Sequence, residues 1–376
     1  MIAGPLPNVE SRPYQERIVA KALDMFAGTY RDCSGRRGPA ADSVLVESPT
    51  GSGKTVMGLL VAAHMQHHHG FRVGWVAMRR NLLKQAAAEN VGRGFNLDLK
   101  LISMFQKEPP EVDLLVVDEA QHDAAHSMAV LHSLVRPKKV LGLTATPYRT
   151  DRLKLCFQQV IRDVGIQQLI EDGHLARYHH YTMPDYSPRR VAEFYSREPK
   201  RWGKALLFFH KYTDCLGCQQ ELARDGLKAE IVTAASQRER QLDEFESGRI
   251  QLLISMYILT EGFDCPSLKT VFCRPSGKSC TVQMAGRVFR RHAEHPFKQI
   301  VQCRDTRHPF SKTAAPDEQY AWMADGWRTL KLNRHLEAVT ARSLRLLAAA
   351  PASLPELVVQ NRVKRPDVRS RRLQTL

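Results

Sequence analysis

Residues 48–55 read SPTGSGKT, and this stretch decides the fold. It follows the apolar run VLVE at 44–47, and a helical pattern begins at Thr55. Glycines at a strand–helix junction let backbone N–H groups approach phosphate oxygens, while the lysine reaches the β and γ phosphates and the hydroxyl ligates Mg²⁺. We therefore expect ATP phosphates to contact Pro49, Thr50, Gly51, Ser52, Gly53, Lys54 and Thr55, with Thr55 also binding Mg²⁺.

Two series of short apolar runs alternate with helix-length segments along the chain. The first series lies at 44–47, 73–77, 101–103, 112–117 and 140–144, and the second at 205–209, 229–232, 251–255, 270–273 and 299–303. Such runs predict parallel sheets that are buried on both faces. We expect two α/β domains, at 1–180 and 181–305, and a helical, basic C-terminal extension at 306–376 whose helix covers 318–349.

The composition favours a polyanionic partner. The 376 residues include 55 Lys and Arg against 39 Asp and Glu, a formal net charge of +16. Clustered cations release counterions from phosphates, although general solubility is an alternative reason for the charge. The chain has no run of 18 apolar residues and no signal-peptide pattern, and its eight cysteines are not spaced as a disulfide scaffold. We expect a cytoplasmic protein with free thiols and no membrane partner.

Two further segments have the chemistry of nucleotide hydrolysis. DEAQ (118–121) ends the apolar run VDLLVV, where Asp118 can hold Mg²⁺ and Glu119 can polarise the attacking water. Far along the chain, QMAGRVFR (283–290) contains Arg287 and Arg290, which can act as arginine fingers on the phosphates. A solvated arginine face is the alternative reading of the second segment.

These motifs together resemble the superfamily 2 helicases and translocases over roughly residues 11–303. RPYQ (12–15), LTATPYR (143–149), GFDCP (262–266) and the QxxGRxxR pattern are most similar to the RadD-like and type III restriction helicase-subunit branch. The chain departs from the usual pattern at Ser48, where many phosphate loops have glycine, and it lacks the zinc-binding C-terminal region of RadD proteins. A DEAD-box protein would carry Asp at the position of Gln121. The resemblance implies two tandem RecA-like P-loop NTPase domains that close on ATP.

The resemblance also implies roles for individual residues. Adenine recognition would fall to Arg12, Tyr14 and Gln15, although this segment can also be read as a helix cap. Thr144 and Thr146 would couple the ATP site to the nucleic-acid site. Gly262 and Asp264 would face the cleft, with Asp264 near the ribose and the arginine fingers, and Gln283 would approach the γ-phosphate.

Cations at predicted strand ends suggest a nucleic-acid track. MRRNLLKQ (78–85) follows the run VGWVA and resembles the family motif that holds the tracking strand. Amides and cations at such a place can bind phosphates, although a solvated helix start is an alternative. The candidate contacts are Arg79, Arg80, Lys84, Ser103, His210 and Thr260. Aromatic residues are only 7% of the chain, so we expect phosphate contacts to dominate affinity.

The sequence therefore predicts an ATP-dependent, Mg²⁺-requiring helicase or translocase that acts as a monomeric motor on nucleic acid, with DNA favoured over RNA. The alternatives are a double-strand translocase or annealing motor, an RNA helicase, and the motor subunit of a restriction or repair complex with a nuclease partner. Two patterns that resemble metal-binding motifs are not interpreted as metal sites. We interpret HHH (67–69) as a helix end and CLGC (215–218) as core packing.

Overall fold

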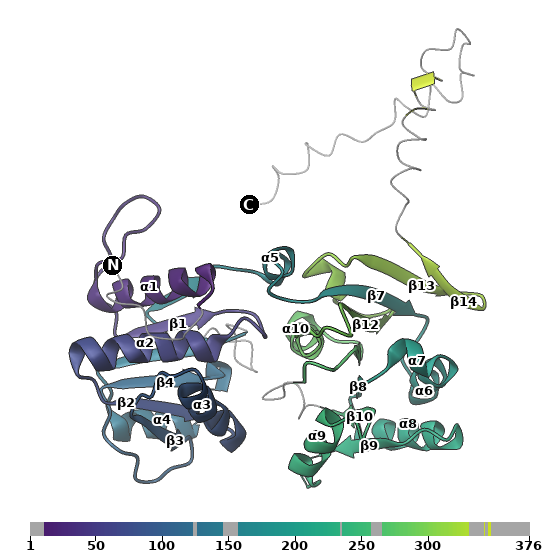
Figure 1. Cartoon of the computed structure of the whole chain (residues 1–376), viewed down its shortest axis with the longest axis horizontal. Coiled ribbons are helices and arrows are strands. Elements are labelled where there is room, and N and C mark those ends of the chain that lie inside the picture. The colour runs from purple at the N-terminus through teal and green to yellow at the C-terminus, as the bar shows by residue number, and fades with distance from the viewer. Residues whose placement is uncertain are drawn as a thin grey trace, which may run out of the picture. The chain divides into compact units, whose positions relative to one another are not determined.

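The computed structural model describes residues 11–122, 126–145, 157–233, 235–256, 265–330, 342, 345 and 346 (Figure 1). Contacts divide the chain into one compact unit, Met1–Thr329, and a second unit, Leu330–Leu376. Within the described part of the chain, no helix has the length and apolar character needed to cross a membrane. The first unit contains two separate sheets, each with its own helices.

The first sheet has six parallel strands in the order β3-β2-β4-β5-β1-β6. Its strands are β1 (Ser43–Glu47), β2 (Val73–Ala77), β3 (Leu99–Ser103), β4 (Leu114–Asp118), β5 (Lys139–Thr144) and β6 (Gln159–Arg162). Its helical elements are α1 (Pro13–Ala27), α2 (Lys54–His69), α3 (Arg80–Gly92), η1 (Ala120–His122) and α4 (His126–Val135). The predicted apolar runs of the first series all form strands here.

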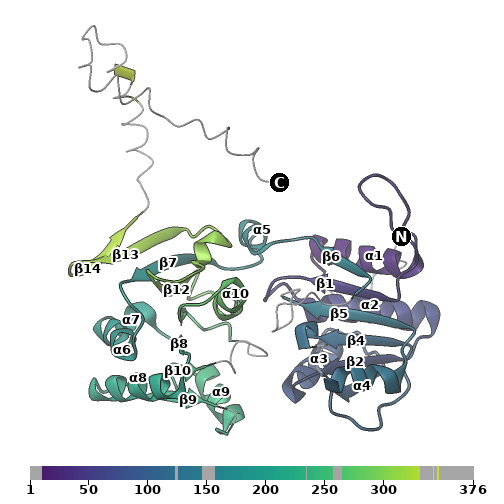
Figure 2. The ribbon, with the colours of Figure 1, turned by 180° about the vertical axis from the view of Figure 1, so that it is seen from behind.

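Helices cover both faces of this sheet, as the fully buried central strands β2 and β4 require. Alternate side chains of β4 separate into two cores, because Leu114 packs with α1, α2 and α3. Its neighbour Leu115 instead packs with Leu131 of α4 on the opposite face. Figure 2 shows α4 from that side. The carboxyl ends of the strands remain open between these layers, and parallel α/β sheets bind ligands at that edge.

The second sheet has eight strands in the order β14-β13-β7-β12-β11-β8-β10-β9, and only the β13–β14 pair is antiparallel. Its strands are β7 (Arg177–Met183), β8 (Ala205–Phe208), β9 (Ala229–Val232), β10 (Leu252–Ser255), β11 (Thr270–Phe272), β12 (Phe297–Cys303), β13 (Glu318–Met323) and β14 (Gly326–Thr329). Its helical elements are α5 (Ile166–Glu171), α6 (Pro188–Arg197), α7 (Pro199–Trp202), α8 (Tyr212–Arg224), α9 (Arg238–Glu246), α10 (Lys278–Gly286) and η3 (Phe310–Lys312).

The expected domain boundary at residue 180 falls within a strand of the second sheet. That residue lies inside β7, and β7 pairs along its whole length with β12 of the second sheet. Every residue from Arg177 to Met183 has a partner in β12, so the strand belongs to the second sheet throughout. Sheet pairing therefore favours a boundary before Arg177.

The helix expected from residue 318 is wrong over its first part, because 318–323 and 326–329 form the β13–β14 hairpin. Aromatic packing stabilises this edge hairpin: Tyr320 stacks on Tyr181 at 4.7 Å between ring centroids, and Trp327 meets Trp202 at 5.6 Å. Aromatic residues on one face of an edge strand outweigh helical propensity. Apart from residues 342, 345 and 346, the expected helix and basic tail beyond 330 lie outside the described residues.

The interpretation of CLGC as core packing is confirmed. Cys215 and Cys218 lie on one side of α8, and both are fully buried in the apolar core of the second sheet. Burial raises the pKa of the Cys215 thiol to about 11, so the thiol stays protonated at neutral pH.

Candidate active site

The phosphate loop connects β1 to α2, and two of its glycines adopt backbone conformations that side chains disfavour. Gly51 has φ 86° and Gly53 has φ 79°. A Cβ at Gly53 would lie 2.5 Å from Nε2 of Gln15, and one at Gly51 would lie 2.9 Å from Leu175. Lys54 Nζ donates to the carbonyls of Ser48 and Pro49, at 3.3 and 3.4 Å. The loop therefore holds the ammonium of Lys54 at the place where the phosphates of ATP would bind.

The acidic pair stands at the end of β4, as predicted. Asp118 is the last residue of the strand, and it accepts a hydrogen bond of 3.0 Å from the backbone N–H of Glu119. Glu119 has a left-handed backbone, with φ 54°, which turns the chain sharply out of the strand. Burial, reinforced by the charge of Glu119, raises the pKa of Asp118 to about 7.

The electrostatics of this pair fit a divalent cation. A buried carboxylate with a raised pKa gains from a nearby positive charge, and carboxylate and hydroxyl oxygens are ligands that Mg²⁺ accepts. Thr55 lies at the start of α2 beside Lys54, and the same cavity is lined by Thr55, Asp118 and Glu119. Burial lowers the pKa of Lys54, while Glu119 and Asp118 partly oppose that shift. These residues would together hold a metal–phosphate group.

A chain of hydrogen bonds connects the acidic pair to the end of β5. Gln121 Nε2 donates to Glu119 at 2.9 Å, and the hydroxyl of Thr144 donates to Gln121 Oε1 at 2.7 Å. The carbonyl of Thr144 in turn accepts the N–H of Ser48 at 2.9 Å. The structure thus places Thr144 between the phosphate loop and the acids, while Thr146 lies outside the described residues. Sequence reasoning did not assign the connecting role to Gln121.

The segment expected to read adenine forms the start of α1 and contacts the phosphate loop. Gln15 Oε1 accepts the N–H of Arg12 at 3.0 Å, so the helix-cap alternative describes one part of its role. Gln15 Nε2 and the Tyr14 hydroxyl both donate to the carbonyl of Ser52, at 2.9 and 2.6 Å. Arg12 donates to the Tyr14 hydroxyl at 3.1 Å. Adenine recognition by these residues stays a prediction.

Residues of the second sheet complete the site. Arg290 donates to the carbonyl of Gly51 at 3.3 Å, and a Cβ on Gly286 would lie 3.2 Å from Thr50. The positive charges of Arg287 and Arg290 contribute to lowering the pKa of Lys54, which means that the three cations share one site. Such a concentration of positive charge is suited to a triphosphate.

One cavity of about 420 Å³ joins these groups. Its lining includes Gln15, Lys54, Asp118, Glu119, Arg287 and Arg290. This volume is in the range of pockets that bind small ligands and cofactors. Gln283 lies half-buried in α10 outside this lining, and Gly262 and Asp264 are not among the described residues.

The predicted nucleic-acid contacts follow three parallel strands at their carboxyl ends. Arg79 precedes α3 after β2, and Arg80 and Lys84 are exposed on α3. Ser103 ends β3, and His210, after β8, lies 2.9 Å from a guanidinium nitrogen of Arg274. Thr260 lies outside the described residues. Arg79, Arg80 and Lys84 thus place positive charge at the carboxyl end of β2 in the first sheet.

Sequence reasoning missed Arg238, the first residue of α9. Its Nε and Nη2 atoms are shielded from solvent and have no hydrogen-bond partner among the residues that the structure describes. Burial and then the charges of Arg79 and Arg287 lower the pKa of the guanidinium. A partly buried guanidinium with two shielded nitrogens that lack partners is suited to an anion, and Arg238 lies near a residue of the predicted track and a residue of the ATP site.

Two family models match the chain. Residues 8–96 match the type III restriction enzyme res subunit, and residues 187–292 match the helicase conserved C-terminal domain. A "51.5 kDa protein" of a Lactococcus phage (isolate 7-9) is 24% identical over 322 residues, which are 76% of this chain and 70% of that protein. The Saccharomyces cerevisiae protein named "Putative ATP-dependent helicase IRC3" is 23% identical over 231 residues, which are 50% of this chain and 34% of that protein.

Solved structures share the fold. The ATP-dependent type ISP restriction-modification enzyme LlaBIII, bound to DNA, matches with a TM-score of 0.58 at 15% identity, covering 81% of this chain and 28% of that enzyme. S. cerevisiae Dbp5, bound to RNA and ADP BeF3, matches with a TM-score of 0.57 at 15% identity, covering 82% of this chain and 89% of Dbp5. The chain thus spans about a third of the yeast protein IRC3 and a smaller part of the restriction enzyme.

A phosphate loop, an acidic pair and two arginines around one cavity, on two RecA-like sheets, define an ATP-dependent helicase or translocase. The matches to the res subunit over residues 8–96 and to the helicase conserved C-terminal domain over residues 187–292 support the resemblance to superfamily 2 helicases of the type III restriction branch.

Proposed function

We propose that this helicase is a DNA motor that hydrolyses Mg²⁺-bound ATP in the cavity between its two sheets and moves along, or separates, DNA strands. The observation that carries the proposal is the single cavity lined by Lys54, Asp118 and Glu119 from one sheet and by Arg287 and Arg290 from the other. A site assembled from two sheets couples hydrolysis to their relative movement.

Each group has a chemical task in this scheme. Lys54 and the amides after Gly51 bind the phosphates, and Asp118 and Thr55 would hold Mg²⁺, which would supply positive charge to the phosphate oxygens. Glu119 orients the attacking water and accepts its proton. Arg287 and Arg290 stabilise the charge that develops in the transition state.

The hydrogen bond between Gln121 and Thr144 is proposed to transmit structural changes in the ATP site to the end of β5. Glu119 changes its contacts when water and phosphate leave, and Gln121 transmits that change to Thr144 at the end of β5. Because β5 lies beside β1 and β4 in the sheet, a shift there reaches both the phosphate loop and the acidic pair.

One observation supports a nucleic-acid track in general, and a second favours DNA. The formal charge of +16 and the cations at the strand ends suit a phosphate backbone, which both nucleic acids share. The preference for DNA rests on the res-subunit match and on the restriction enzyme LlaBIII, whose structure is described as bound to DNA.

Nucleic-acid-stimulated ATPase activity tests the proposal. Single-stranded DNA, duplex DNA and a matched RNA should be compared at equal nucleotide concentration, with Lys54→Ala as the inactive control. We expect stimulation by DNA that exceeds stimulation by RNA and is absent in the variant. Equal or greater stimulation by RNA would contradict the DNA assignment.

A second candidate is the motor of a restriction complex, which translocates on duplex DNA without separating strands. The match of residues 8–96 to a res subunit favours it. A strand-displacement assay run beside a translocation assay separates the two: movement on duplex DNA without displaced strand supports this second function.

A further inference from the structure

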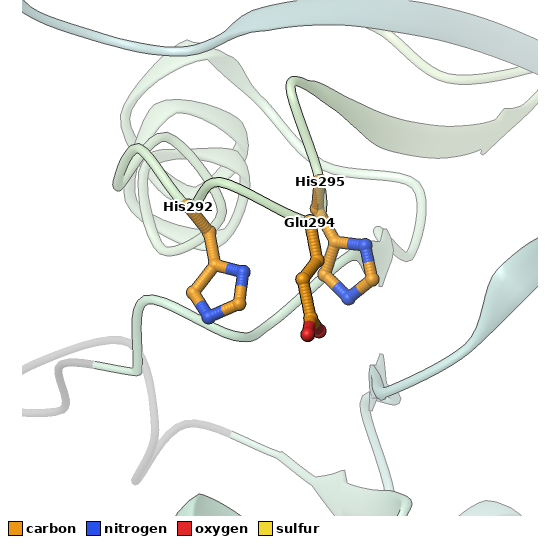
Figure 3. Close-up of side chains that lie close together, drawn as sticks. All are labelled: His292, Glu294 and His295. Atoms are coloured by element: carbon orange, nitrogen blue, oxygen red, sulfur yellow. The ribbon is translucent and has the colours of Figure 1, made fainter.

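Three potential metal ligands cluster in the loop between α10 and β12. His292, Glu294 and His295 each offer one ligand atom, and these atoms all lie within 4.8 Å of one another. Figure 3 shows the side chain of Glu294 between the two imidazole rings in that view. The cluster begins two residues after Arg290, and it lies outside the lining of the ATP cavity.

The local backbone holds the two histidines together. The N–H of His295 donates to the carbonyl of His292 at 3.1 Å, which closes a turn over these residues. Their rings lie nearly parallel, with centroids 5.3 Å apart and an interplanar angle of 27°. The turn therefore orders two of the three ligands without any metal, so binding would require little rearrangement of the backbone.

One ring nitrogen of His292 is already withdrawn from water without a hydrogen-bond partner among the described residues. Nδ1 of His292 is shielded from solvent and makes no hydrogen bond to any described residue. Leaving a buried polar atom unpaired costs about 1–3 kcal/mol, and such atoms call for a specific explanation. Coordination of a metal ion through the lone pair of Nδ1 supplies that explanation.

Two cations close to the cluster in sequence, Arg291 and Lys298, donate hydrogen bonds to backbone carbonyls outside the cluster. Arg291 donates to the carbonyl of Gly173 at 2.8 Å. The buried ammonium of Lys298 donates to the carbonyls of Pro266 and Leu268, at 2.7 and 2.6 Å. Among the residues that the structure describes, no ion pair joins either cation to Glu294, whose exposed carboxylate is available to a metal ion.

We propose that His292, Glu294 and His295 form a binding site for a divalent transition-metal ion of the zinc class. Two imidazoles and one carboxylate are a ligand set that zinc uses, with water completing the coordination. Mg²⁺ and Ca²⁺ prefer oxygen ligands, so this site differs in kind from the Mg²⁺ site beside Asp118. Tetrahedral ligands lie roughly 3.4 Å apart at zinc distances, so the side chains close by about 1 Å on binding.

A metal ion at this position would stabilise the loop in which it binds. A bound ion would cross-link residues 292–295 and fix the loop that follows the two arginines of the ATP site. This inference does not depend on ATP hydrolysis, because metal binding can be measured without nucleotide.

Direct metal measurement tests the proposal on the full-length protein. The chain is stripped with a chelator, incubated with ZnSO₄, passed through gel filtration and analysed for zinc by mass spectrometry. The double variant His292→Ala/His295→Ala removes two ligands, and Glu294→Gln removes the carboxylate with almost no change of shape. We expect the unaltered chain to retain about one more zinc per chain than the double variant, with weaker retention in Glu294→Gln.

A matched control addresses zinc bound elsewhere. His64 and His68 of α2 have ring centroids 4.5 Å apart, and they form another histidine pair that could hold zinc. The variant His64→Ala/His68→Ala should keep the extra zinc if the loop cluster is the site. Equal zinc in the unaltered chain and the His292→Ala/His295→Ala variant, or loss of zinc in the α2 variant instead, would overturn the proposal.

Thermal unfolding gives a second readout that does not depend on stoichiometry. An ion that binds only the folded state raises the melting temperature, so ZnSO₄ should raise it in the unaltered chain more than in Glu294→Gln. Circular dichroism in chelator verifies that each variant is folded. An equal zinc-induced shift in the unaltered chain and in Glu294→Gln would also contradict the site.

Discussion

Two aspartates at opposite ends of β4 should respond oppositely to the same substitution. Asp118, at the carboxyl end, is buried, and its pKa is raised to about 7 from an ordinary value of 3.8. Asp113, just before the strand, accepts hydrogen bonds of 3.0 Å from the backbone N–H and from Nε of Arg72, and these bonds lower its pKa. The first carboxylate is therefore a cost to folding, while the second stabilises the fold.

The sign at Asp118 follows from proton uptake. The unfolded chain loses this proton near pH 4 and the folded chain near pH 7, so the unaltered protein loses stability as the pH rises between these values. One pKa unit corresponds to about 1.4 kcal/mol, which gives an upper limit of roughly 4 kcal/mol at pH 8. We expect Asp118→Asn to raise the free energy of unfolding by about 2–4 kcal/mol at pH 8, and by less at pH 5.

Asp113→Asn serves as the matched control. The amide cannot replace a carboxylate that accepts three hydrogen bonds from Arg72, and hydrogen bonds to charged groups contribute about 1.5–3 kcal/mol each. Because half of the Arg72 side chain is exposed, we expect a loss of only about 1–2 kcal/mol in total at pH 8.

Urea unfolding at pH 5, 6, 7 and 8, followed by tryptophan fluorescence, measures both effects. Trp75 of β2 reports on the first sheet, since the other three tryptophans lie at or beyond residue 202. Adding Mg²⁺ and ADP should stabilise the unaltered chain more than Asp118→Asn, because the cation favours the carboxylate. Destabilisation of Asp118→Asn at pH 8, or a difference independent of pH, would refute the reasoning.

Three further predictions concern the ATP site and the track. Arg290→Ala should slow ATP hydrolysis by about 10³- to 10⁵-fold with less effect on ATP binding, whereas the neighbouring Arg291→Ala should have little effect; equal loss in both would contradict a specific role. Gln121→Ala and Thr144→Val should be non-additive in stability by about 0.5–3 kcal/mol in a double-mutant cycle, and additivity would disprove their coupling. Arg238→Ala should reduce the slope of log affinity for duplex DNA against log salt by about 1, and an unchanged slope would exclude a phosphate contact.

Local patterns in the sequence were sufficient to predict the site's principal elements. The strand before SPTGSGKT, the acids ending β4 and the strands of both series were predicted because each depends on residues close together in the chain. Apolar runs of this kind form parallel strands, and the residues that follow the strands lie at their carboxyl ends. The glycines and acidic residues after these runs are therefore brought together at one edge of the sheet.

Features that depend on distant contacts were not predictable in this way. The β13–β14 hairpin was mistaken for helix because its stability comes from Tyr320 and Trp327 packing on residues more than a hundred positions earlier. The connecting role of Gln121 was not predictable, because its hydrogen bond with Thr144 joins residues that are 23 positions apart and meet only in the folded chain. Arg238 resembles any solvated residue at a helix start, and only the folded chain reveals its burial without a partner.

The central claim is that ATP is hydrolysed in a site built from both sheets and that nucleic acid controls this hydrolysis. The most direct measurement is steady-state ATPase activity without nucleic acid, with single-stranded DNA and with duplex DNA, for the unaltered chain, Lys54→Ala and Arg290→Ala. We predict activity that rises with DNA in the unaltered chain and is lost in both variants. Activity that ignores nucleic acid, or that persists in Arg290→Ala, would contradict the account.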